Sequence, residues 1–109
     1  MRGDALVEDR LFQALADPNR RAILQSLTQG EAAVKDLTAR FAISQPAISQ
    51  HLASLRAAGL VNGRREGRHV YYRVEPRGLA PLVDWIKHYR EFWPQHVNRL
   101  ERLLQRLDD

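Results

Sequence analysis

Amide and hydroxyl side chains gather between Ser44 and Gln50, in the stretch SQPAISQ. Gln45 and Gln50 each carry a donor and an acceptor at the tip, and that pair matches the N7 and N6 edge of adenine in the major groove of DNA. Ser49 can bond to either kind of base, and Pro46 offers an apolar contact to a thymine methyl group. We therefore predict that Gln45, Pro46, Ser49 and Gln50 form a surface that contacts base edges.

Positive charge lies next to this stretch. Between Arg56 and Arg77 the sequence has six arginines and two acids, a balance that accounts for the whole net charge of +4. A basic block in an otherwise neutral chain indicates a polyanionic partner, and double-stranded DNA is the usual one. On charge alone, a solvated basic surface is an equal alternative. The residues we expect to contact the DNA backbone are Ser44, His51, Arg56, Arg64, Arg65 and Arg68.

Three helices are expected to precede the polar stretch. Apolar residues recur at helical spacing in residues 5–16. Asp17 and Pro18 then end that helix and begin the next, because Asp17 can cap free amides and proline suits a first helical turn. The second helix ends near Gly30, and a short third helix covers residues 34–41.

The polar stretch itself opens a fourth helix. Ser44 is a good N-cap, Pro46 is tolerated in the first turn, and Gly59 supplies the exit. The face that we expect to be buried has apolar residues at i, i+4 and i+7, namely Ile48, Leu52 and Leu55. Two helices joined by a tight turn, the second with a polar outer face, describe a helix-turn-helix.

A change of period follows at Leu60–Val74, where apolar and polar residues alternate as in a strand. Glu66-Gly67 is the expected hairpin turn, with arginines on both sides of it. A hairpin with a basic tip directly after a helix-turn-helix is typical of a wing. A purely structural hairpin is the alternative, but it leaves the three arginines at the tip without a role.

The last third, Leu79–Leu107, has one apolar stripe at helical spacing. Pro94 interrupts this pattern and should kink or split the helix near Phe92-Trp93. The stripe is longer than the preceding head can cover, so we expect the terminal helices to pair across a two-fold axis in a homodimer. Packing back on the chain's own head is the alternative. The expected interface residues are Leu6, Leu11, Leu82, Ile86, Tyr89, Trp93, Val97 and Leu100.

The chain of 109 residues is expected to form one domain. In this interpretation residues 18–74 form the helix-turn-helix and wing, and residues 5–16 and 79–107 are dimerisation helices. The fold class is mainly α with a β-hairpin wing and five or six helices. Neither a membrane span nor an export signal is expected, since acids interrupt the N-terminus, so we place the protein in the cytoplasm. There are no cysteines for disulfides, thiolate metal sites or thiol chemistry.

Three segments resemble the ArsR/SmtB-type winged-helix repressors. ALADPNRRAIL at 14–24 is similar to their opening, ISQPAISQHL at 43–52 with LRAAGLV at 55–61 to their recognition helix and exit, and REGRHVYYR at 65–73 to their wing. The resemblance covers about residues 5 to 105. It implies a dimeric bacterial repressor of transcription that binds DNA through a winged helix, pairs through its terminal helices and can repress its own gene.

The sequence departs from the metal-sensing members of that family. Ala33-Val34-Lys35 stands where they carry Cys-Val-Cys, so two ligands are missing and a cation is present. Asp84, His88 and Glu91 fall at i, i+4 and i+7 and could share a metal, but they lie opposite the expected apolar seam and face solvent. We therefore expect no cofactor and no metal. The resemblance points to the non-metal branch of the family, whose inducers are often unknown.

Three other functions are alternatives. A zinc-type metal-responsive repressor would use the last-helix residues Asp84, His88 and Glu91. An enzyme would need a pocket that shifts pKa values, yet no nucleophile accompanies those three residues and no Gly-rich loop is present, so catalysis is not expected. A protein-interaction module would use the aromatic C-terminal helix as a docking face. Binding to DNA agrees best with the polar stretch and the basic hairpin together.

Overall fold

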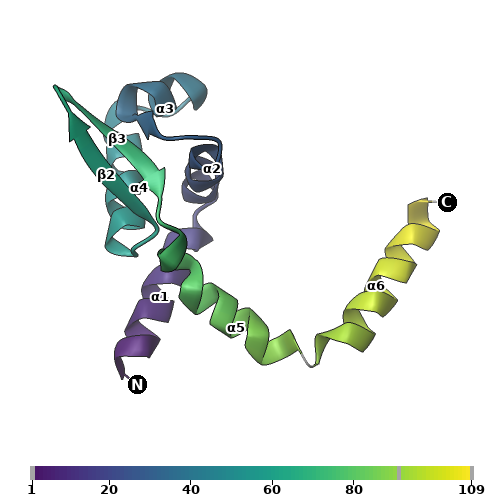
Figure 1. Cartoon of the computed structure of the whole chain (residues 1–109). Coiled ribbons are helices and arrows are strands. Elements are labelled where there is room, and N and C mark those ends of the chain that lie inside the picture. The colour runs from purple at the N-terminus through teal and green to yellow at the C-terminus, as the bar shows by residue number, and fades with distance from the viewer. Residues whose placement is uncertain (1, 91, 109) are drawn as a thin grey trace.

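The computed structural model describes residues 2–90 and 92–108, and side-chain positions are described except at residues 2–7, 93–95, 97 and 108. The elements in chain order are α1 (Arg2–Ala16), α2 (Pro18–Leu27), β1 (Ala32–Ala33), α3 (Val34–Arg40), α4 (Gln45–Ala57), β2 (Val61–Glu66), β3 (His69–Val74), the 3₁₀ helix η1 (Pro76–Leu79), α5 (Ala80–Arg90) and α6 (Trp93–Asp108). The described residues thus combine six α-helices with one small sheet, as the sequence predicts (Figure 1).

Helices α1 and α2 meet at a well-capped corner. Asp17 has an extended backbone, and its Oδ1 accepts hydrogen bonds from the backbone N–H of Asn19 at 2.8 Å and of Arg20 at 3.1 Å. Pro18 occupies the first turn of α2, where its missing N–H leaves no bond unmade. The break between the two helices therefore lies where the sequence places it.

The core is built around α4. Ile48, Leu52 and Leu55 are at most 1% exposed and pack with residues of α1, α2 and α3 and with the start of β2. Ser44 caps α4, because its Oγ accepts a hydrogen bond from the N–H of Ala47. Because these three residues lie on one face of α4 and are buried, the opposite face of the helix remains exposed.

The sheet has the strand order β1-β3-β2, with both pairings antiparallel. Glu66 pairs with His69, so the hairpin loop is Gly67–Arg68, one residue later than the expected turn. Gly67 has φ +62 and Arg68 does not have a positive φ, which suits a type II′ turn with glycine in first place. Strand β1 was not predicted from the sequence, since two alanines carry no strand period.

The C-terminal third is split into two helices. The predicted continuous stripe ends at Arg90 with α5, and α6 starts at Trp93, which places Pro94 in the first turn of the second helix. Helix α6 stands away from the head and its end points outward (Figure 1). Residue 91 and the side chains of Leu6, Trp93 and Val97, three expected interface residues, lie outside the described part of the chain.

Helix α5 is held to the head through its beginning. A Cβ at Gly78 in η1 would lie 1.9 Å from the carbonyl oxygen of Gly59, so only glycine lets η1 approach the α4–β2 turn this closely. Leu79 and Leu82 then pack against the core. Phe12 of α1 meets Trp85 edge to face, with the ring centroids 5.4 Å apart. Within the described residues, no helix is long and apolar enough to cross a membrane.

Candidate nucleic-acid interface

The first two turns of α4 carry the predicted base-contacting residues on the outside of the head. Gln45, Pro46, Ser49 and Gln50 are all exposed. Pro46 and Gln50 lie on the side opposite to the face that Ile48 and Leu52 bury, because a helix turns 100° per residue. Gln45 is seven residues before Leu52 and lies near that face, but it is exposed in the first turn of the helix. The structure therefore leaves all four residues exposed over the first two turns of α4. Contact with bases remains a prediction for each of the four.

Three further predicted contacts surround that surface. Ser44 uses its Oγ as an acceptor for the Ala47 N–H at 3.3 Å, and its hydroxyl proton remains able to donate to a phosphate. Arg56 is exposed in the last turn of α4, on the side of Gln45 and Ser49. His51 is half-buried on the opposite flank, next to the start of α2. The pKa of Asp17 is lowered chiefly by the hydrogen bond from the Arg20 backbone amide, then by the one from Asn19 and by the nearby His51.

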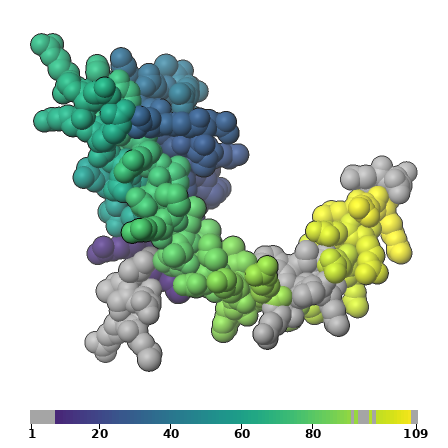
Figure 2. Space-filling model, in the orientation of Figure 1, coloured from purple at the N-terminus to yellow at the C-terminus, as the bar shows by residue number. Residues whose placement is uncertain are grey.

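The wing extends beyond the body of the head, alongside α4 (Figure 1). Since β2 runs back antiparallel to the direction of α4, the loop at Gly67–Arg68 reaches past the α4 N-terminus, and Figure 2 shows this tip as a projection of the surface. Arg65 and Arg68 near the tip are exposed. Neither forms an ion pair with any described carboxylate.

Arg64 differs from its two neighbours because it is bound within the protein. Its Nε donates to both carboxylate oxygens of Glu31, at 2.9 and 3.2 Å, and its Nη1 donates to Glu66 at 2.8 Å. Its guanidinium also lies 5.2 Å from the ring centroid of Tyr71. The hydrogen bond from Arg64 lowers the pKa of Glu31 and, in return, raises the pKa of Arg64. Two carboxylates thus offset the positive charge of Arg64, a residue that we expected from the sequence to contact the DNA backbone.

The pleat of the hairpin explains this division. Arg65 pairs with Val70, on the face of the sheet that Val61 and Tyr72 turn toward the core and α4. Arg64 pairs with Tyr71 on the opposite face, where Glu31 approaches from the turn before β1. Glu31 lies 33 residues from Arg64 in sequence, and no local pattern links the two.

The predicted interface residues fall into two groups. Leu11 is 0% exposed and belongs to the core of the protomer, so its assignment to the dimer interface is wrong. The Leu11 side chain packs in the core with residues of α2 and α4, which leave no surface on it for a second copy. Leu82 is half-buried against the core, whereas Ile86, Tyr89 and Leu100 are 36%, 43% and 54% exposed. Further exposed apolar residues that the prediction omitted are Val83, Trp85, Phe92, Leu103, Leu104 and Leu107.

The candidate metal residues show no cluster in the described part of the chain. Asp84 and His88 are exposed on α5, and Glu91 lies outside the described residues. Across residues 2–90 and 92–108, no group of three His, Cys, Asp or Glu side chains is placed to hold a metal ion.

Comparison with known proteins identifies the segment that contains α4. The family model for "Bacterial regulatory protein, arsR family" matches residues 17–63, from the α2 cap through α4 into β2. Over 96 residues the chain is 47% identical to the HTH-type transcriptional regulator Rv2034 of Mycobacterium tuberculosis. These residues are 88% of this chain and 87% of the relative. The chain belongs to the arsR family. It is a winged helix-turn-helix, DNA-binding regulator of transcription.

Two further members of the arsR family support the whole fold. The transcriptional repressor SdpR of Bacillus subtilis is 33% identical over 81 residues, which are 74% of this chain and 90% of that protein. The solved structure of an ArsR-like transcriptional regulator from Rhodococcus sp. RHA1 superposes with a TM-score of 0.74 at 27% identity, over 93% of this chain and 95% of that one. The similarity therefore extends beyond the matched segment into the terminal helices.

Proposed function

We propose that this arsR-family regulator is a homodimeric repressor that binds a pseudo-palindromic operator. In this proposal α4 enters the major groove, Gln45, Ser49 and Gln50 contact base edges, and Arg65 and Arg68 of the wing contact phosphates. One observation carries this proposal: the exposed amides Gln45 and Gln50 of α4 occur together with two exposed wing arginines, Arg65 and Arg68. Among the described residues, neither arginine has a carboxylate partner. Amides alone or arginines alone occur on many surfaces.

The exposed apolar surface of α5 and α6 supports a dimer. Leu100, Leu103, Leu104 and Leu107 repeat at i, i+3, i+4 and i+7, and each is more than half exposed. The radius of gyration is 17.2 Å, whereas a compact domain of this length has about 13 Å. An arm that extends so far with a leucine stripe along it needs a partner, and a second copy provides the same stripe. The two copies of α4 would then lie about 34 Å apart, one turn of DNA.

Repression follows in this proposal from occupancy of the operator, which blocks access of the polymerase. The protein's own promoter is the first place to look for such an operator. The protein acts in the cytoplasm and has no catalytic role, because the groups assembled on its surface bind DNA rather than activate a nucleophile. No cofactor is assigned.

Footprinting of the DNA upstream of the protein's own gene tests the proposal. We expect protection of two half-sites one helical turn apart, with α4 variants as the probe of specificity. Gln50→Ala should weaken the footprint at the concentration at which the wild type protects. Gln29→Ala is the matched control, since Gln29 is an exposed amide in the turn after α2 and does not belong to α4. If that DNA is ignored while a protein partner is captured instead, the repressor proposal is wrong.

A further inference from the structure

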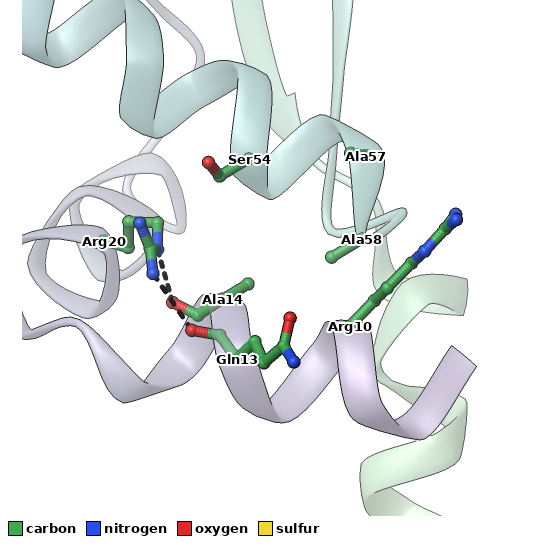
Figure 3. A pocket seen from close by; sticks show the side chains of 7 residues that line it. All are labelled: Arg10, Gln13, Ala14, Arg20, Ser54, Ala57 and Ala58. Atoms are coloured by element: carbon green, nitrogen blue, oxygen red, sulfur yellow. Dashed lines mark hydrogen bonds between the residues drawn. The ribbon is translucent and has the colours of Figure 1, made fainter. Parts of the chain in front are cut away.

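A pocket of about 410 Å³ opens between α1, α2 and the C-terminal half of α4 (Figure 3). Its volume lies within the range of small-molecule sites in proteins. It is separate from the wing and from the first two turns of α4. The residues that line it are Arg10, Gln13, Ala14, Arg20, Ser54, Ala57 and Ala58.

The charge of this lining is entirely positive. Two of the seven residues are arginines and none is acidic. Among the described residues, neither Arg10 nor Arg20 forms an ion pair with a carboxylate. Figure 3 shows the two at opposite ends of the pocket, Arg20 on α2 and Arg10 on α1. The guanidinium of Arg20 lies at one end, whereas the side chain of Arg10 extends from α1 away from Arg20 and past Ala58, so a ligand would meet the cation of Arg20 at one end and the stem of Arg10 at the other (Figure 3).

Arg20 is held in place before any ligand arrives. Its Nε donates to the carbonyl oxygen of Ala14 at 2.8 Å, and its Nη2 donates to that of Gln13 at 3.0 Å, so it is fixed to the last turns of α1 (Figure 3). A guanidinium has five N–H donors, and these two bonds leave three of them. A fixed guanidinium with donors to spare is well suited to an oxyanion, because little side-chain entropy is lost on binding.

The rest of the lining suits an organic body. Ser54 and the side chain of Gln13 can each form a hydrogen bond, and three alanine methyl groups supply an apolar wall. We propose that this pocket binds a small organic anion, one that carries a carboxylate or a phosphate toward Arg20 and a second polar or charged group toward Arg10.

The position of the pocket links this ligand to DNA. Ser54, Ala57 and Ala58 belong to α4 or its cap, the helix that carries the candidate base-contacting residues. A ligand wedged between α1 and α4 changes the angle between the helix that enters the groove and the body that holds it. The anion is therefore an effector of DNA binding, a step that rests on the proposed function of α4.

Calorimetric titration of the full chain with two probes, succinate and inorganic phosphate, tests the site in the absence of DNA. Sodium chloride at equal ionic strength controls for general screening. We expect saturable binding of at least one probe to the wild type, and binding about tenfold weaker in Arg10→Ala and in Arg20→Ala.

Arg21→Ala is the matched control. Arg21 also donates to the end of α1, to the carbonyl oxygens of Leu15 at 2.6 Å and Ala16 at 3.1 Å, but it does not line the pocket. Loss of these bonds should leave probe affinity within about twofold of the wild type. Equal weakening in Arg21→Ala and Arg20→Ala would overturn the site, because it would trace the effect to the α1–α2 corner in general.

A second arm measures operator affinity with and without a saturating probe. A change in the wild type that is absent in Arg10→Ala supports the effector role, and no change overturns that role while leaving the calorimetric site intact. If neither probe saturates but Arg10→Ala weakens operator binding, the pocket receives a DNA phosphate and the small-anion proposal is wrong. Failure to find any operator would count against the proposed function alone, because the calorimetry uses no DNA.

Discussion

Removal of single arginines from the wing should separate those that contact DNA from the one that holds the wing in place. Arg65 and Arg68 have no carboxylate partner among the described residues, whereas Arg64 is bonded to Glu31 and Glu66. We therefore expect Arg65→Ala to weaken binding to all DNA sequences and to reduce its salt dependence. Arg64→Ala should change the salt dependence little, because Arg64 already has its counterions within the protein.

The expected size follows from the number of phosphates neutralised. For double-stranded DNA, the slope of log affinity against log salt is about −0.9 for each phosphate contact. A dimer carries two wings, so Arg65→Ala removes two contacts and reduces the slope by about 1.8. The double variant at Arg65 and Arg68 removes four and reduces it by about 3.6. Arg64→Ala should give a change near zero.

Fluorescence anisotropy of a labelled duplex provides the measurement, with salt varied between about 50 and 200 mM. The operator and a random duplex of the same length are compared, since phosphate contacts should affect both alike. A slope that falls as much for Arg64→Ala as for Arg65→Ala would refute the reasoning. It would mean that DNA displaces Glu31 and that all three arginines serve the backbone.

Three other predictions use the same protein. Gln50→Ala should cost about 1–3 kcal/mol at particular base pairs and spare random DNA in anisotropy, while equal losses on both duplexes would exclude base contact. Leu104→Asp should shift sedimentation toward the monomer, whereas Asn98→Asp on the opposite face of α6 should leave the dimer intact. If both variants remain dimers, the interface lies elsewhere. Asp17→Asn keeps the cap but loses the charge, and the folded state lowers the pKa of Asp17 below its ordinary 3.8. Its deficit in melting temperature should therefore be full near neutral pH and disappear as acid protonates the native carboxyl; a deficit independent of pH would exclude the charge as its cause.

Local chemistry made much of the head predictable from the sequence. The Asp17-Pro18 corner, the Ser44 cap and the turn near Gly67 each depend on residues within a few positions of one another. The apolar period of α4 likewise determines which face is buried and leaves Pro46 and Gln50 outside. Pro94 is also a local signal, because proline lacks a backbone N–H, and it predicted an interruption of the last helix.

Contacts between distant segments were decided by the tertiary structure. Arg64 and Arg65 are adjacent and chemically identical, yet only Arg64 faces Glu31, because the strand alternates sides and β1 brings Glu31 to one of them. Leu11 fits an interface stripe in sequence but is covered by α2 and α4 once the helices pack. The pocket between Arg10 and Arg20 likewise exists only where α1 and α4 meet. Sequence periodicity gives the exposed side of an element, whereas the partner of that side depends on which elements folding brings together.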